Sequence, residues 1–164
     1  MTAATYTYLP EHGLFDLTLL NAESASANFD DIFIEGVQRG MPVELLTRLR
    51  GLWETTKAIA GEVIAIGKII VQKIFEFLKQ NPKLTLGIAL GAAVGVLIAG
   101  IPLIGSLLSP IATLITTLYG AAVGTTMDAG QASASFTDAA FALADKFFEL
   151  LKMIFSSIAE YWTA

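Results

Sequence analysis

Histidine and cysteine, two residues that commonly carry catalysis, are scarce in this chain of 164 residues. It has one histidine, His12, and no cysteine, so the sequence excludes thiolate metal sites and cysteine nucleophiles. Ser106 and Ser109 stand in an apolar stretch without a recognisable base or phosphate-binding loop. We therefore predict no catalytic residue, no metal and no cofactor, and expect that the protein is not an enzyme.

Glycines are the residues whose spacing is informative. Small residues recur every four positions in two places, at Gly87, Gly91, Gly95 and Ala99 and again at Gly120 and Gly124. This spacing lines one helix face with small residues, so that another backbone can approach closely. Each interior glycine costs a helix about 1 kcal/mol relative to alanine, so the rows indicate close helix packing. Association between copies and packing within one molecule both fit the spacing.

Both rows lie in residues 84–127, a run of 44 residues without a charged side chain. Because about 20 apolar residues span a bilayer as one helix, the run predicts a hydrophobic helical hairpin. Its turn is expected between residues 100 and 110, where four helix-breaking or turn-forming residues stand: Gly100, Pro102, Ser109 and Pro110.

Long amphipathic helices are expected on both sides of the hairpin. Apolar residues at alternating steps of four and three predict one helix over 42–80, with Asn81 and Pro82 as its stop. A similar spacing predicts a second helix over 135–160. The first helix fits packing on the hairpin and also fits binding to a lipid surface. The aromatic pair Tyr161 and Trp162 fits either a bilayer interface or a core.

Residues 1–40 predict an acidic N-terminal arm, because Phe15, Leu17 and Leu19 alternate with polar residues before a small polar linker at 21–28. This arm is expected to be irregular or weakly β. Residues 41–164 are expected to form one helical, membrane-active domain. The predicted fold class is thus mainly α.

Composition and charge favour a membrane as partner. The chain is 54% hydrophobic and 15% charged, with a mean hydropathy of +0.64, whereas soluble domains carry about 25% charged residues. The net charge is −5, yet residues 39–83 hold eight basic and four acidic residues. The acidic ends argue against nucleic acid, and the basic stretch suits anionic lipid. The N-terminus lacks a basic region typical of a secretory signal, so we expect synthesis in the cytoplasm and export by another route.

A charge-free hairpin with the row Gly87, Gly91 and Gly95, flanked by amphipathic helices in a small cysteine-free chain, resembles glycine-zipper pore-forming toxins. It is most similar to small membrane-depolarising effectors of type VI secretion. The resemblance covers residues 84–127 and the general layout. It implies a secretion-tube carrier, insertion into a rival's bacterial inner membrane, homo-oligomerisation, ion leakage and a cognate immunity protein.

A resident membrane protein is the alternative to a toxin. Glycine zippers also occur in structural membrane proteins, so the chain could instead be a small scaffold subunit of an envelope complex or a phage membrane-crossing component. A stable water-soluble form of the purified chain favours the toxin, whereas obligatory extraction with detergent favours a resident subunit.

Overall fold

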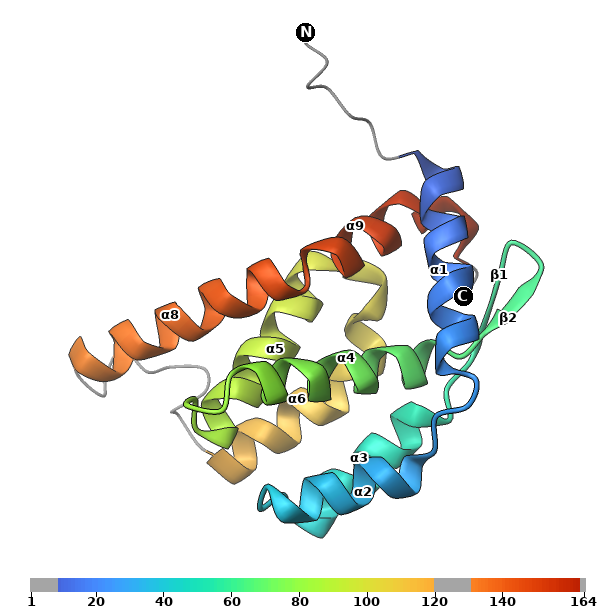
Figure 1. The fold of residues 1–164 in the computed structure, drawn as a ribbon. Coiled ribbons are helices and arrows are strands. Elements are labelled where there is room, and N and C mark those ends of the chain that lie inside the picture. The colour runs from blue at the N-terminus through green and yellow to red at the C-terminus, as the bar shows by residue number, and fades with distance from the viewer. Residues whose placement is uncertain (1–8, 120–130, 163–164) are drawn as a thin grey trace, which may run out of the picture.

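The computed structural model describes residues 9–119 and 131–162, and these are mainly helical, as predicted (Figure 1). The α-helices of the described residues are α1 (Pro10–Ser24), α2 (Phe29–Gln38), α3 (Val43–Trp53), α4 (Ile66–Gln80), α5 (Leu86–Gly100), α6 (Gly105–Tyr119), α8 (Gln131–Phe147) and α9 (Glu149–Ser157). Two strands form an antiparallel hairpin, β1 (Lys57–Ile59) and β2 (Glu62–Ile64). Two short 3-10 helices are η1 (Pro102–Ile104) and η3 (Ala159–Tyr161).

The prediction of an irregular or weakly β arm is wrong for the described part of residues 1–40, which forms α1 and α2. Pro10 occupies the first turn of α1, and the Leu9 amide donates to His12 Nδ1 at 3.0 Å. Asn28 caps α2 by accepting a hydrogen bond from the Asp30 amide. The three alternating apolar residues do not share one face, because Leu17 is buried while Phe15 and Leu19 are exposed. Within this segment α1 packs on α4 and α9, and α2 packs on α3.

The single helix predicted over 42–80 is also wrong. The chain leaves α3 at Trp53, forms β1 and β2, and re-enters a helix at Ile66. Ala60 and Gly61 have φ values of 51° and 87°, which a right-handed helix excludes and a tight hairpin turn requires. Ile59 and Ile64 are buried from the strands, whereas Val63, which follows Ile59 in the predicted helical spacing, is exposed.

The reversal between α5 and α6 is shorter than predicted. Gly100 is the last residue of α5, and Pro102 is the first residue of η1. Ser109 and Pro110 do not belong to this turn, because they lie inside α6. Pro110 is exposed and is the sixth residue of α6, so the helix lacks the hydrogen bond that an amide at this position would donate to the Ser106 carbonyl.

The helix predicted over 135–160 is divided in two. It starts earlier, at Gln131, and it breaks at Phe148 between α8 and α9. Phe148 is 1% exposed, so the break places a large apolar side chain in the core.

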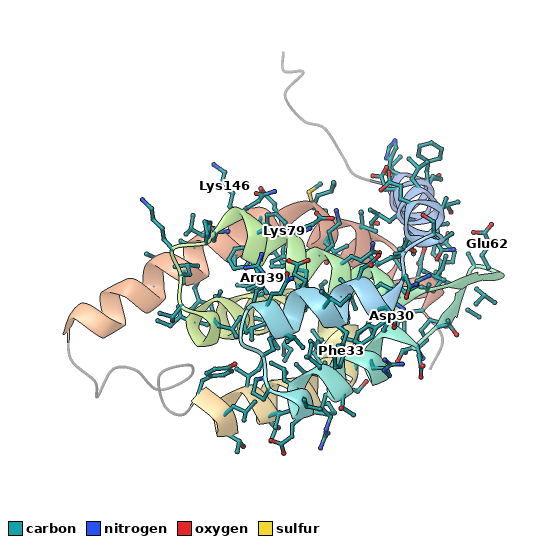
Figure 2. All side chains as sticks on the ribbon, turned by 60° about the horizontal axis from the view of Figure 1, so that its bottom comes forward. Asp30, Phe33, Arg39, Glu62, Lys79 and Lys146 are labelled. Carbon is teal, nitrogen blue, oxygen red and sulfur yellow. The ribbon has the colours of Figure 1, made fainter. Side chains whose placement is uncertain are left out.

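The remaining elements surround α5. Helices α4, α6 and α8 pack directly on it, while α3 supports α4 and α6, and α1 lies across α4 and α9 (Figure 1). Helix α2 packs on α3. Glu35 of α2 also reaches Arg39 at 3.1 Å and Lys79 of α4 at 3.6 Å, and Figure 2 shows these two basic residues close together.

The hairpin turn gives a prediction for stability. Ala60→Asn should raise the free energy of unfolding by about 0.5 kcal/mol, because asparagine adopts positive φ more readily than alanine. Gly61→Ala should lower it by about 1 kcal/mol for the opposite reason. Urea unfolding followed by circular dichroism measures both changes. An unchanged midpoint for Gly61→Ala would contradict the turn.

Candidate functional site

Helix α5 is the most unusual element of the fold. Its 15 residues include no charged and no polar side chain. Nine of them are buried: Gly87, Ala89, Leu90, Gly91, Ala92, Ala93, Val94, Val96 and Leu97. A helix that is apolar all round needs an apolar neighbour on every side, and α4, α6 and α8 provide these neighbours.

The glycine row of α5 faces aromatic rings of the same chain. A Cβ atom added at Gly87 would lie 2.8 Å from Cγ of Tyr119, at the end of α6. A Cβ atom added at Gly95 would lie 2.8 Å from Cε1 of Phe141 in α8. Both distances are shorter than real Cβ contacts, so each ring occupies space that only glycine leaves free. In this state the described part of the row packs within one molecule.

The row changes character along α5. Gly87 and Gly91 are buried, Gly95 is half-buried, and Ala99 is exposed. The predicted second row, Gly120 and Gly124, lies outside the described residues. The row therefore runs from the interior of the fold to its surface.

A small apolar cavity of about 160 Å³ lies beside the Phe141 ring. We call its wall on α5 and α6 the glycine groove: Gly91, Val94, Gly95, Ala112, Ile115 and Thr116. Because space remains next to the ring, Phe141 does not fill the groove completely. The groove is a site where helices approach closely, and its chemistry is apolar.

The junction of α8 and α9 holds this part of the chain in place. Phe147 and Phe148 contact the ring of Phe77 in α4, with ring centroids 5.5 and 5.7 Å apart. The aliphatic stem of Lys152 covers Gly100, and its ammonium group pairs with Asp145. The junction thus connects α8 both to α4 and to the end of α5.

Three of the eight basic residues of 39–83 contact aromatic rings. Arg50 lies 5.0 Å from the centroid of Phe29, and Lys68 lies 5.6 Å from that of Trp53. Lys57 lies 5.5 Å from the ring of Trp162. Trp162 also packs on Phe155 at 6.0 Å, so in this state it belongs to the packed part of the fold.

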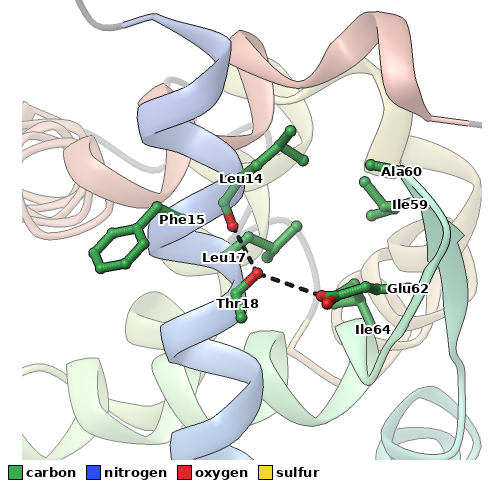
Figure 3. Close-up of a pocket in the computed structure, with 8 residues that line it drawn as sticks. All are labelled: Leu14, Phe15, Leu17, Thr18, Ile59, Ala60, Glu62 and Ile64. Carbon is green, nitrogen blue, oxygen red and sulfur yellow. Dashed lines mark hydrogen bonds between the residues drawn. The ribbon is translucent and has the colours of Figure 1, made fainter.

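A second pocket, of about 280 Å³, separates α1 from the β-hairpin (Figure 3). Leu14, Leu17, Ile59 and Ile64 supply much of its apolar wall. Thr18 Oγ1 donates to the Leu14 carbonyl at 2.8 Å and reaches Glu62 Oε1 at 3.4 Å. The polar side chains at this pocket therefore interact with each other across its mouth.

The histidine and serine residues considered for catalysis belong to different helices. His12 belongs to the first turn of α1, whereas Ser106 and Ser109 are exposed on α6. Across residues 9–119 and 131–162, no three His, Cys, Asp or Glu side chains gather where they would hold a metal ion. Within the same ranges, no helix has both the length and the apolar character that crossing a membrane requires.

Comparison with known protein families, curated proteins and solved structures finds no match to this chain.

Two glycine positions give a matched test of the close contact. Gly87→Ala should lower the free energy of unfolding by about 1–2 kcal/mol, because the added methyl overpacks against Tyr119. Gly51→Ala should raise it by up to about 1 kcal/mol, because its Cβ meets open space in α3. Urea unfolding measures both. Equal stabilisation by the two changes would show that Tyr119 does not restrict position 87.

Proposed function

We propose that the chain is a non-enzymatic, pore-forming toxin that depolarises a target bacterial inner membrane. In this proposal residues 84–127 insert as a hairpin, and the row Gly87, Gly91 and Gly95 then packs between copies in a homo-oligomer. The observation that carries the proposal is the burial of α5, an entirely apolar helix, beneath α4, α6 and α8.

Helix α5 is apolar on every side, which is typical both of a central core helix and of a membrane-spanning helix. Helices at the edge of a core keep one polar stripe for water, and α5 has none. It also carries several glycines, each of which costs about 1 kcal/mol in a helix. A helix that has to exchange protein neighbours for lipid and for copies of itself needs both features.

Insertion requires α5 to lengthen. Fifteen residues at 1.5 Å each give a helix of about 22 Å, whereas the hydrocarbon core is about 30 Å thick. Adding Leu84, Thr85 and Ile101 gives 18 uncharged residues and about 27 Å, which lies within the usual range for a spanning helix. Residues 105–127 provide 23 further uncharged residues for the second arm. The reversal at η1 remains as the turn.

The charged residues lie outside this run, on the segments that cover it. Lys79 and Lys83 precede it, and Asp128 follows it. Both ends of the hairpin can therefore stay in water on the same side of the bilayer. Hydrogen bonds within each helical arm satisfy the backbone in lipid. The resemblance to type VI effectors adds the proposed route: synthesis in the cytoplasm, a secretion-tube carrier and a cognate immunity protein.

A substitution at an exposed threonine can test membrane insertion without disturbing the fold. Thr113 lies on the water-exposed side of α6 and near the middle of residues 105–127. Thr113→Asp should leave urea unfolding almost unchanged, because surface substitutions have small effects. It should reduce potassium leakage from anionic vesicles about 100-fold, since a charge at a helix centre costs about 2.5–3.5 kcal/mol in a membrane.

Thr47→Asp in α3 is the matched control, because Thr47 is also exposed and lies outside the apolar run. It should leak as the parent does. Undiminished leakage by Thr113→Asp would contradict insertion of the second arm. A parent chain that leaves vesicles sealed and needs detergent for extraction would instead support a resident scaffold subunit or a phage membrane-crossing component.

A further inference from the structure

We propose that α8 is an autoinhibitory cover: Phe141 occupies the glycine groove that assembly needs, and α8 swings away at Phe148 before copies associate. This inference rests on the proposed pore-forming function and specifies how that function is held off in the described fold.

Helix α8 packs mainly on α5 and lies at the edge of the molecule (Figure 1). Ala140 and Ala144 are both 0% exposed, and their short side chains let the backbones of α8 and α5 come close. Between them Phe141 projects onto Gly95. Apart from its C-terminal end, where Phe147 contacts Phe77 of α4, helix α8 mainly covers the glycine groove.

Helix α8 and a second copy of α5 would compete for the same face of α5. Packed helix axes lie about 8–10 Å apart, and glycine rows pack at the short end because no side chain separates the backbones. The ring of Phe141 already lies where a Cβ at Gly95 would clash. The remaining cavity of about 160 Å³ cannot admit another helix backbone. Helix α8 and a second copy of α5 consequently exclude each other.

A hinge with a fixed base joins α8 to α9. Phe148, between α8 and α9, has φ −92° and ψ 9°, which interrupts the helix. Beyond it Leu151, Ile154 and Phe155 are buried, and Gly13 of α1 packs closely on the end of α9. Helix α9 is thus anchored in the core. Helix α8 can rotate about Phe148 while this anchor stays in place.

An ion pair spans the hinge. Asp145 on α8 pairs with Lys152 on α9, whose stem rests on Gly100. The Asp145 side chain is 66% exposed, and exposed pairs contribute at most about 1 kcal/mol. The pair is therefore a weak latch that steadies the closed angle and can be opened.

Removing the ring tests the cover directly. Phe141→Ala should raise the initial leakage rate from anionic vesicles about tenfold. The reason is that loss of the ring contacts should lower the equilibrium constant for the closed position of α8 by about tenfold. Leu143→Ala is the matched control, because Leu143 is on the exposed face of the same helix, 46% accessible. Its leakage should equal that of the parent. A Phe141→Ala rate no higher than the control rate would overturn the cover.

A reversible lock tests the same movement without relying on a weakened fold. The chain has no native cysteine, so Asp145→Cys combined with Lys152→Cys gives two thiols that flank the hinge. A short bis-methanethiosulfonate cross-linker bridges them, and a reductant releases the bridge. The parent chain and each single cysteine variant, given the same reagent, are the controls.

The bridged double variant should leak at least about tenfold more slowly than its reduced form, and it should form no cross-linkable oligomers. Equal leakage by the bridged and reduced forms would overturn the cover and leave pore formation standing. Sealed vesicles with the parent chain, with all variants and under both conditions would overturn the proposed function itself.

Discussion

Helix α5 has no face that water can solvate, and the positions of the other helices follow from this constraint. Helices α4, α6 and α8 each place apolar side chains on α5. The charged residues of α4 and α8 are half-buried or exposed, and α6 has none. Helices α1 and α3 then bury the apolar faces of these neighbours. Because the hydrophobic effect is not directional, a bilayer can satisfy α5 as well as these neighbours do. The described fold and the proposed inserted state are two ways of removing one helix from water.

Close contact at glycine is the second recurring feature. Gly13 meets α9, Gly36 meets Leu46 of α3, and Gly67 meets the backbone of Leu52. Gly87 and Gly95 on α5 use the same geometry with aromatic rings as partners. Such contacts are tight in the folded monomer, yet each is lost when the helices separate. In the described fold, glycine therefore allows close packing within the molecule. In the proposed inserted state, it leaves the surface of α5 free of bulky side chains, so that copies can associate.

Local patterns in the sequence revealed the helical class and the apolar run, because both depend only on neighbouring residues. The sequence does not reveal the β-hairpin because Ile59 and Val63 fit a helical spacing, although Val63 is 68% exposed in the structure and Gly61 between them is a usable turn signal. The break at Phe148 depends on packing against Phe77, which no local pattern contains. The glycine row was visible, but the rings opposite Gly87 and Gly95 come from distant helices. The spacing alone fits both association between copies and packing within one molecule. Contacts with distant helices show that the row packs within one molecule in the described fold.

The central claim is that α5 exchanges a protein cover for lipid. Hydrogen–deuterium exchange of the full chain, with and without anionic vesicles, tests it most directly. The account predicts that amides of α5 stay protected in both conditions, because the helix remains intact and shielded, while amides of α8 lose protection when vesicles are added. An unchanged exchange pattern in α8 under conditions where the protein is bound to vesicles would contradict the account.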